Sequence, residues 1–503
     1  MSTSRASTVD GTLQRSAARH PDRVALLFAD RSWTYAELDA AVSRAAQVLL
    51  DLGLEHGDRV ATYGRNSDAY LLAYLGCARA GLVHVPINYA LTGTELSYLV
   101  EDSGARAVLV DPALRPELDA AGISVEVVVP LRDADGSLLA QASEGPVPVI
   151  DVEVVDGDLV QLLYTSGTTS KPKGAMMTHR ALVHEYVSSI VALEYDETDE
   201  PLHPMPLYHS AGMHVFLMPY LAVGATNHLM ETPDIPEILR LVEERRLRSL
   251  FLAPTVWVPL SQHPDFATRD LSSLRKAFYG ASIMPLPVLQ RLQAALPGLG
   301  FWNCFGQSEI GPLATVLRPE EHVERPESCG RAVLFVEIRV VDEVGRDVPP
   351  GESGEVVYRS PQLCEGYWGK PEETAEAFRD GWFHSGDLVR VDAQGYLTVV
   401  DRIKDVINTG GVLVASREVE DVLYTHPAVA EVAVIGTPDE RWIEAVTAVV
   451  VVKSPVTPED LIAHAKQSLA GFKIPKRVHV VDELPRNQSG KLLKRVLRDD
   501  LAE

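Results

Sequence analysis

The chain has 503 residues, 46% of them hydrophobic, and its 70 acidic residues outnumber 46 basic residues to give a formal net charge of −24. This length and apolar content predict a globular protein of more than one domain. The acidic surface argues against nonspecific binding to nucleic acid or to anionic membranes.

Neither a disulfide framework nor a zinc site is indicated, because Cys77, Cys304, Cys329 and Cys364 are scattered and form no CxxC pair. The N-terminus lacks an apolar signal region, and no apolar run reaches the length of a membrane span. We therefore expect a cytoplasmic protein.

Helical and strand patterns alternate along the first part of the chain, as they do in α/β proteins. Residues 34–53 predict a helix, because Thr34 and Glu37 form a capping box and Gly53 follows the pattern. The next predicted elements are a strand over Arg59–Tyr63, a helix over Tyr70–Ala80, a strand over 84–88 and a surface connection over 131–149.

A loop rich in glycine, hydroxyl groups and lysine follows the apolar strand predicted over Leu159–Leu163. Its sequence is YTSGTTSKPKG, from Tyr164 to Gly174. Glycine lets backbone N–H groups approach an anion, hydroxyls and successive N–H groups form an anion-binding concavity, and Lys171 and Lys173 add charge. The spacing is not that of a Walker A loop. The loop indicates a polyphosphate site, although solvated surface loops share this composition.

Four further segments carry chemical patterns that also have ordinary structural interpretations. In FWNCFGQSEIG, Phe305 could stack on a flat base and Glu309 could hold Mg²⁺ beside a triphosphate, or the two could be a core aromatic and a solvated glutamate. In GWFHSGDL, Asp387 could accept two ribose hydroxyls or be a turn aspartate. Lys491 in PRNQSGKLLKR could belong to a solvated tail, and His209 in PLYHSAGMH to the core.

The last part of the chain predicts a compact unit of its own, with a junction near residues 398–411. Thr457 is the predicted N-cap of a helix that has Pro458 at its first position. The predicted elements are helices over 416–427 and 457–472 and strands over 429–436, 445–453 and 476–481.

In this order and spacing, the segments YTSGTTSKPKG, PLYHSAG, FGQSE, SGD with DRIKD, and PRNQSGK resemble the adenylate-forming superfamily of acyl-CoA synthetases, nonribosomal-peptide adenylation domains and firefly luciferases. The resemblance covers about residues 10–497. It implies an α/β fold with a large N-terminal adenylation domain of layered subdomains, residues 1–402, and a small mobile C-terminal α+β domain, residues 403–503.

The reaction that the resemblance implies has two halves. A carboxylate attacks the α-phosphate of ATP to give an acyl-adenylate and pyrophosphate, and a thiol, usually CoA, then displaces AMP. Lys491, Glu309 and His209 are the implied catalytic residues, and Glu309 and Thr169 the implied Mg²⁺ ligands. The implied nucleotide- and CoA-binding residues are Thr165, Ser166, Gly167, Thr168, Thr169, Lys173, Gly280, Ala281, Ser282, Phe305, Gly306, Ser308, Asp387, Arg402, Gly410, Gly411, Trp442 and Phe472.

The substrate expected from the implied acyl pocket is a hydrophobic carboxylic acid. That pocket involves His209, Met213, Phe251–Trp257 and Gly280–Ala281, which are mainly apolar and include no carboxylate for an amino group. ATP, Mg²⁺ and CoA are the implied cofactors. A separate acyl-acceptor enzyme or carrier and a homodimer stay open. Lys404 occupies the position of the hinge about which the C-terminal domain would rotate.

The chain departs from its relatives mainly where the second half-reaction is expected. Val412 and Leu413 replace a usual Glu-Asn pair, Ile443 replaces a usual glycine, and Ser170 replaces a glycine of the phosphate loop. Either a working acyl-CoA synthetase tolerates these changes, or the enzyme is a dedicated adenylating enzyme with weak CoA ligation. A non-catalytic binding protein and a luciferase-like oxygenase are further alternatives.

Overall fold

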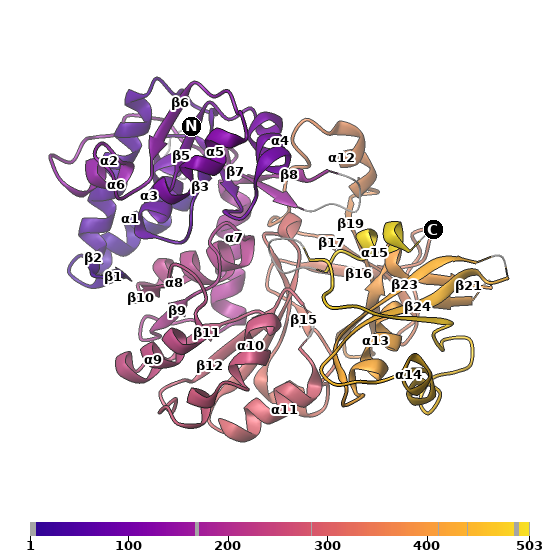
Figure 1. Cartoon of the computed structure of the whole chain (residues 1–503). Coiled ribbons are helices and arrows are strands. Elements are labelled where there is room, and N and C mark those ends of the chain that lie inside the picture. Colours follow the sequence, from indigo (N-terminus) through magenta and orange to yellow (C-terminus); the bar gives the residue numbers. More distant parts are fainter. Residues whose placement is uncertain are drawn as a thin grey trace. The chain divides into compact units, whose positions relative to one another are not determined.

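The computed structural model of the chain describes residues 7–165, 171–282, 284–410, 412–439, 441–486 and 492–501. Its contacts divide the chain into two compact units (Figure 1), Met1–Ile338 with Tyr358–Phe383, called unit 1, and Arg339–Val357 with His384–Glu503, called unit 2. The predicted α/β class is confirmed. The predicted boundary between residues 402 and 403 stays a prediction. It marks where a mobile C-terminal domain would begin, whereas the two units are defined by their internal contacts.

Unit 1 contains a six-stranded sheet in the order β6-β5-β3-β4-β7-β8, parallel except for the β7–β8 pair. Apolar clusters cover both faces, one with side chains of α2, α3 and α6 and the other with side chains of α4 and α5. The strands are β3 (Arg59–Tyr63), β4 (Val83–Ile87), β5 (Ala107–Val110), β6 (Val127–Pro130), β7 (Leu159–Thr165) and β8 (Lys173–Thr178). The helices are α1 (Val9–Arg19), α2 (Tyr35–Asp51), α3 (Asp68–Arg79), α4 (Gly93–Ser103), α5 (Arg115–Ala120) and α6 (Leu138–Ser143).

The second sheet of unit 1 has nine strands in the order β15-β14-β13-β12-β11-β9-β10-β1-β2. Side chains of α9, α10 and α11 form an apolar cluster with its central strands. The strands are β1 (Val24–Phe28), β2 (Arg31–Thr34), β9 (Pro201–His203), β10 (Asn227–Leu229), β11 (Ser249–Phe251), β12 (Lys276–Gly280), β13 (Gly300–Gly306), β14 (Leu313–Leu317) and β15 (Arg331–Ala332). The helices are α7 (His179–Ala192), a π-helix (Ala211–Leu217), α8 (Met218–Val223), α9 (Ile235–Arg245), α10 (Pro254–Leu260), α11 (Leu286–Ala295) and α12 (Pro371–Ala377).

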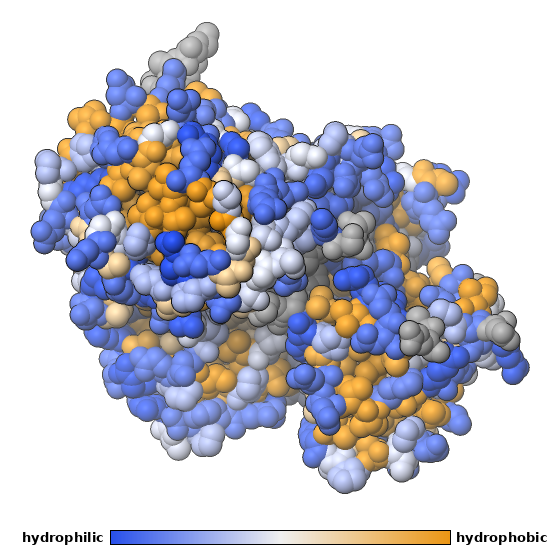
Figure 2. Space-filling view, turned by 45° about the horizontal axis from the view of Figure 1, so that its top comes forward, coloured by the Kyte–Doolittle hydropathy of each residue, from blue (hydrophilic) through white to orange (hydrophobic). Residues whose placement is uncertain are grey.

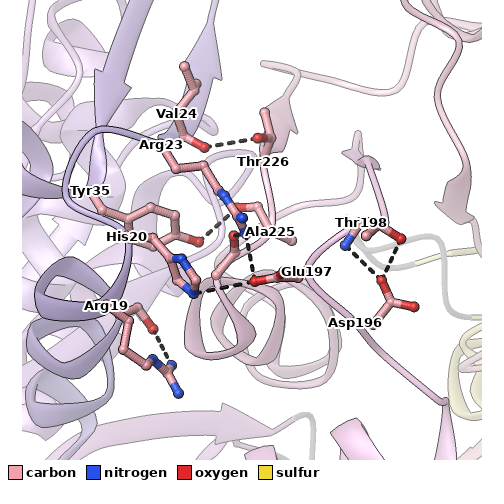
Figure 3. Close-up of polar contacts among 12 residues, drawn as sticks. Arg19, His20, Arg23, Val24, Tyr35, Asp196, Glu197, Thr198, Ala225 and Thr226 are labelled. Carbon is pink, nitrogen blue, oxygen red and sulfur yellow. Dashed lines mark hydrogen bonds and ion pairs between the residues drawn. The ribbon is translucent and has the colours of Figure 1, made fainter.

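The N-terminal strand β1 joins this sheet by pairing in parallel with β10. The pairing brings together two segments that are about two hundred residues apart in the chain. Figure 3 shows the polar contacts at this junction. Glu197 forms ion pairs with Arg23 at 2.9 Å and with His20 at 3.3 Å. The buried Tyr35 hydroxyl donates to the carbonyl oxygen of Ala225 at 2.7 Å. These bonds fix the N-terminal segment to the sheet.

Unit 2 contains the sheet β22-β21-β24-β23, to which β25 adds by pairing with β24. Side chains of α13 and α14 cover one face, and α15 contributes to the cluster on the other face. These elements are β21 (Ile407–Thr409), β22 (Val412–Val414), β23 (Val429–Asp439), β24 (Ile443–Val452), β25 (Arg477–Val480), α13 (Ser416–Tyr424), α14 (Pro458–Ala465) and α15 (Lys494–Asp500). A further sheet, ordered β16-β17-β19-β18 with β20 on β19, takes its residues from both units. Its strands are β16 (Glu337–Val341), β17 (Ser353–Arg359), β18 (Phe378–Arg379), β19 (Trp382–Val391) and β20 (Leu397–Arg402).

Most predicted elements agree with the structure, and two predictions are wrong. The capping box of Thr34 and Glu37 opens α2 as expected. The predicted surface connection over 131–149 instead contains α6, whose Leu138, Leu139 and Ala142 are buried, because a short helix can bury apolar residues without a long periodic pattern. The helix predicted to continue to residue 472 ends at Ala465, beyond which three-residue hydrogen bonds from Gln467 and Ser468 alternate with a four-residue bond from Leu469.

A chain of buried hydrogen bonds crosses the interior of unit 1. The His84 ring bonds Thr62 at 3.0 Å and accepts from the Gln161 amide at 3.0 Å. His214, on the π-helix, bonds the Gln161 oxygen at 2.6 Å and accepts from the Tyr186 hydroxyl at 3.1 Å. Burial lowers the pKa of each histidine to about 3, so both rings are neutral at physiological pH.

Hydrophilic side chains cover most of the face drawn in Figure 2, with hydrophobic patches between them. Across the described parts of the chain, we find no helix with both the length and the apolar character needed to cross a lipid bilayer.

Candidate active site

The glycine-rich loop connects two paired strands. Thr165, the last residue of β7, lies opposite Lys173, the first residue of β8. Thr165 and Lys173, which flank the undescribed residues 166–170, therefore lie at the end of an antiparallel pair at the edge of the six-stranded sheet. Six predicted site residues lie outside the described residues, namely Ser166, Gly167, Thr168, Thr169, Gly411 and Lys491.

Glu309 accepts hydrogen bonds from two distant parts of unit 1. The hydroxyl of Thr165 donates to its Oε1 at 3.1 Å, and the phenol of Tyr367 donates to the same oxygen at 3.1 Å. The Glu309 side chain is buried, on a short 3₁₀-helix (Ser308–Ile310). The structure thus joins the predicted acidic residue to the start of the predicted phosphate loop.

The two lysines of the loop each lie near an aromatic ring. The Lys171 ammonium lies 4.9 Å from the ring centroid of Tyr98, and the Lys173 ammonium lies 5.2 Å from that of Tyr367. The Tyr98 hydroxyl also donates to the carbonyl oxygen of Pro172 at 3.0 Å. A cation–π contact attracts an ammonium without supplying a counter-charge, so the two rings orient these lysines without forming ion pairs with them.

The GAS motif follows β12, which lies beside β13 in parallel. A Cβ atom at Gly280 would lie 2.2 Å from the carbonyl oxygen of Cys304, so the close approach of the two strands requires glycine there. Ala281 has φ of 63°, a left-handed conformation that is unusual for alanine and is typical of functional sites. Ala281 and Ser282 are both exposed, as an adenine-binding wall requires.

The FGQSE motif follows β13 and contacts the PLYHSAG motif. Phe305 and Gly306 are half-buried at the end of the strand. The Ser308 and Ser210 hydroxyls are 2.9 Å apart, which joins the two motifs. His209, next to Ser210, accepts from the backbone N–H of Ala211 at 3.3 Å.

The predicted acyl-pocket residues lie in different surroundings. Met213 is buried on the π-helix, and Phe251 stacks on Phe216 with ring centroids 4.0 Å apart. A cavity of about 10 Å³ adjoins this pair of rings. Trp257 belongs instead to the apolar core, where its indole N–H donates to the carbonyl oxygen of Phe278 at 3.0 Å.

In unit 2, Asp387 and Arg402 face each other across the β19–β20 pair. Their side chains form an ion pair of 2.6 Å in which the Asp387 carboxylate is buried. Lys404 follows on a 3₁₀-helix, and burial lowers the pKa of its ammonium. Asp405, at the end of that helix, pairs with Arg498 of α15 at 2.6 Å.

Three positions at which we expect the sequence to depart from the resemblance are exposed in unit 2. Val412, Leu413 and Ile443 are 45%, 64% and 61% exposed. Ile443 has φ of 68°, a left-handed conformation that is strained for a β-branched residue. The backbone N–H of Gly410 donates to the carbonyl oxygen of Trp442 at 2.5 Å, next to this strained residue.

The two aromatic residues predicted to flank CoA have basic neighbours. The Trp442 ring lies 4.8 Å from the guanidinium of Arg441 and 5.5 Å from the ammonium of Lys476. The Phe472 ring lies 5.7 Å from the ammonium of Lys473. Arg441 and Lys476 place positive charge beside Trp442, which suits an anionic ligand, whereas Lys473 also pairs with Glu418 at 2.5 Å.

Sequence reasoning missed Tyr367, which lies in the stretch CEGYWGK and matches no charge pattern. It also missed the basic neighbours Arg441, Lys473 and Lys476. Their partners lie far along the chain or at irregular spacing, so periodicity gave no signal for them. The available signal was the tyrosine between two glycines, EGYWG, which is also typical of a turn.

Two family models match the chain. Residues 13–368 match the model described as AMP-binding enzyme, and residues 418–491 match the model described as AMP-binding enzyme C-terminal domain. Feruloyl-CoA synthase of an Amycolatopsis species is 39% identical, covering 96% of this chain and 97% of its own length. A medium/long-chain-fatty-acid–CoA ligase of Mycobacterium tuberculosis is 35% identical, covering 95% of this chain and 88% of its own length.

Among solved structures, that of ATP-bound MatB from Rhodopseudomonas palustris is similar over 99% of both chains, with a TM-score of 0.91 and 31% identity. o-Succinylbenzoate CoA synthetase from Bacillus subtilis, in complex with its acyl-adenylate intermediate, covers 98% of both chains with a TM-score of 0.88 and 30% identity. Both similarities extend through the two units of the chain.

Proposed function

The chain belongs to the AMP-binding enzyme family of adenylate-forming acyl-CoA synthetases, and from this premise we propose how its residues perform the reaction. The protein is an acid–thiol ligase that uses ATP to convert a carboxylic acid to an acyl-adenylate and then to a CoA thioester. The observation that carries the residue assignment is the meeting of Thr165, Glu309 and Tyr367 at the start of the glycine-rich loop.

The phosphates of ATP bind the loop from Thr165 to Gly174 in this proposal. Lys171 and Lys173 supply positive charge beside it. Glu309, with the hydroxyl of Thr169, holds Mg²⁺, since carboxylate and hydroxyl oxygens are the ligands that this hard cation prefers. The metal, when bound, neutralises charge on the phosphates.

The nucleoside binds between the GAS and FGQSE motifs, with Phe305 stacked on adenine. The Asp387 carboxylate accepts the ribose hydroxyls, and its ion pair with Arg402 orients it. Lys491 neutralises the two anions that meet when the carboxylate attacks the α-phosphate. Electrostatic contacts of this kind are worth about 10²–10³ in rate.

A hydrophobic acid, aromatic or aliphatic, is the substrate that we propose. The residues near the predicted pocket include His209, the buried Met213 and the stacked Phe216–Phe251 pair, which offer apolar contact. The relatives named above act on feruloyl and fatty acyl groups, which supports a choice within this class.

CoA binds unit 2 through Trp442 and Phe472, whose basic neighbours suit its phosphates. Because the relatives are CoA ligases, the dedicated adenylating and non-catalytic alternatives are not favoured. A carrier partner and a homodimer stay predictions, as does rotation of the C-terminal part about Lys404 between the two half-reactions.

Mass spectrometry of the products tests this proposal. The enzyme is incubated with ATP, Mg²⁺ and a panel of acids that includes ferulate, indoleacetate, medium-chain fatty acids and bulky polycyclic acids, with and without CoA. We expect acyl-AMP without CoA and acyl-CoA with it, and Lys491→Ala should lower acyl-AMP formation by about 10²-fold or more. Absence of both products across the panel, or undiminished adenylation by the variant, would contradict the assignment.

A further inference from the structure

Glu185 is a buried carboxyl group to which the roles above assign no function. It lies on α7 with no exposed surface. Its Oε1 accepts from the Ser189 hydroxyl at 3.1 Å and from the backbone N–H of Leu313 at 3.2 Å, and its Oε2 accepts from the Gln362 amide at 2.5 Å. None of these partners carries a charge, and burial raises the pKa of the carboxyl well above its usual range. Such a group is costly to bury, which prompts the question of what it holds.

Gln362 connects this carboxyl to the turn that carries Glu309. Its amide nitrogen also donates to the carbonyl oxygens of Ile310 at 3.3 Å and Leu313 at 3.2 Å. Its oxygen accepts from the Ser188 hydroxyl at 2.6 Å. Every polar atom of the Gln362 side chain therefore has a partner, and reversing the amide would place its oxygen against two carbonyl oxygens.

The turn itself packs directly on Glu185. Gly311 has φ of 102°, and a Cβ atom there would lie 3.2 Å from the Glu185 side chain. Two residues after Gln362, the backbone N–H of Cys364 donates to the carbonyl oxygen of Glu309 at 2.8 Å. The segment from Gln362 to Tyr367 thus bonds both the backbone of Glu309, through Cys364, and its carboxylate, through Tyr367.

We propose that Glu185 and Gln362 are positioning residues for Glu309, and that they set the metal-dependent part of the enzyme's affinity for ATP. The carboxyl orients the Gln362 amide, the amide holds the turn from Ile310 to Leu313, and the turn sets the place of the Glu309 carboxylate. This inference rests on the proposed role of Glu309 in holding Mg²⁺. Groups that orient a metal-binding carboxylate commonly change metal affinity by about 10–100-fold.

The substitution Glu185→Gln tests the direction of these hydrogen bonds with almost no change of volume. Both carboxyl oxygens accept from N–H groups, at Leu313 and at Gln362. Even a protonated carboxyl can accept at both oxygens, because its hydroxyl oxygen keeps a lone pair, whereas the NH₂ group of the introduced amide only donates and must meet one of the two donors. The turn then loses one of two hydrogen bonds, either the bond from the Leu313 N–H or the bond from the Gln362 amide, while the packing of α7 is unchanged.

The experiment measures the dissociation constant of ATP by calorimetry, with Mg²⁺ and separately with EDTA, for the full-length wild type, Glu185→Gln and Glu309→Gln. Tyr220→Phe is the matched control, because it removes a buried hydrogen bond of 2.7 Å to Ser249 elsewhere in unit 1. Urea unfolding of each protein records the change in stability. For Glu185→Gln we expect Mg·ATP affinity to fall about tenfold, with the EDTA value almost unchanged. Tyr220→Phe should have a lower free energy of unfolding. It should keep the full gain in ATP affinity that Mg²⁺ produces relative to EDTA, which is the Mg²⁺-dependent increment.

Each other outcome has a distinct meaning. If Glu309→Gln loses the Mg²⁺-dependent increment and Glu185→Gln keeps it, the positioning role is overturned and the role of Glu309 stands. The same conclusion follows if Glu185→Gln weakens ATP binding by the same factor with Mg²⁺ and with EDTA. If Glu309→Gln keeps the increment, the proposed role of Glu309 fails, and the positioning role fails with it. If Glu185→Gln does not fold, Ser189→Ala removes one donor to the carboxyl and should cost about threefold in the same increment. No loss there would overturn the proposal.

Discussion

The phenol of Tyr367 donates a hydrogen bond of 3.1 Å to the carboxylate of Glu309. Burial raises the pKa of Tyr367, and the neighbouring Glu309 charge raises it further, so the phenol keeps its proton at physiological pH. The same oxygen of Glu309 accepts from Thr165 at 3.1 Å. The Oε1 atom of Glu309 therefore accepts both orienting hydrogen bonds. The Oε2 atom is the one that we expect to contact a ligand.

Tyr367→Phe should lower Mg·ATP affinity and the rate of acyl-AMP formation by about tenfold, because Glu309 loses one of its two orienting donors. Pyrophosphate exchange at varied Mg·ATP measures both effects. Tyr35→Phe, which removes a buried hydrogen bond to Ala225 far along the chain, is the control and should leave the kinetics unchanged. Equal kinetics for Tyr367→Phe and wild type would show that this bond does not orient Glu309.

Ile443→Asn should raise the free energy of unfolding by about 1 kcal/mol. The left-handed conformation at φ of 68° costs an ordinary L-residue about 1–2 kcal/mol, and asparagine tolerates it better. The shift of the urea midpoint measures this gain. Val412→Asn is the control, since Val412 is also exposed but has no positive φ, and its effect should stay within about 0.5 kcal/mol. A loss of stability in Ile443→Asn would mean that its exposed side chain makes a stabilising contact that outweighs the strain.

The double substitution Val412→Glu with Leu413→Asn, which restores the residues usual among relatives, should change the KM for CoA by no more than about twofold. Both side chains are exposed, so neither is part of the buried core of unit 2, and a twofold change corresponds to about 0.4 kcal/mol of binding free energy. Steady-state thioester formation at varied CoA measures the change. A rise of tenfold or more in thioester formation, with adenylation unaltered, would instead identify these two aliphatic residues as a restriction on the second half-reaction.

Stability should fall as the pH drops below about 6.5, in part because His84 and His214 are buried in neutral form. Their folded pKa of about 3 lies below the unfolded value of 6.5, so the unfolded chain takes up protons first. The stability that depends on the neutral rings is complete above pH 6.5 and is lost as the pH falls toward about 3. At pH 5 the loss is about 2 kcal/mol for each histidine.

Urea unfolding at pH 7.5 and pH 5 checks this expectation. His84→Gln should reduce the loss between the two pH values by about 2 kcal/mol, because the replacement does not titrate. Tyr74→Phe removes a hydrogen bond of 3.2 Å to Tyr186 in the same buried chain and should keep the full pH dependence. An unchanged pH dependence in His84→Gln would show that His84 is not a source of the acid sensitivity.

Local signals predicted the elements that depend on neighbouring residues. Thr34 and Thr457 cap their helices as expected, since each cap needs only the residues of the first turn. The long-range pairing of β1 with β10 had no such signal, because parallel partners are chosen by the packing of the whole sheet. The short helix α6 was missed for the same reason, since its burial depends on distant helices.

At the candidate site, motifs identified individual residues but not the groups that orient them. Glu309 and Asp387 were assigned roles through the resemblance of their segments to the family, whereas Glu185 and Gln362 look like ordinary helix and loop residues in the sequence. Their importance arises only when α7 and the segment after β17 are brought against one turn. Orientation of this kind is a property of three-dimensional contact, which no spacing rule contains.

The composition of unit 2 from two stretches of chain has a consequence for dissecting the protein. A fragment that starts after Arg402 would leave out Asp401, whose carboxylate accepts from the backbone N–H of Ser416 at 2.6 Å and from its hydroxyl at 2.8 Å. It would also leave out the carbonyl oxygen of Val399, to which Arg417 donates at 2.5 Å. The start of α13 would then have to recruit water in place of both partners. Expression of the C-terminal part should accordingly begin at or before Arg339, where the first stretch of unit 2 starts, and recombination with related enzymes should exchange β19, β20 and α13 together.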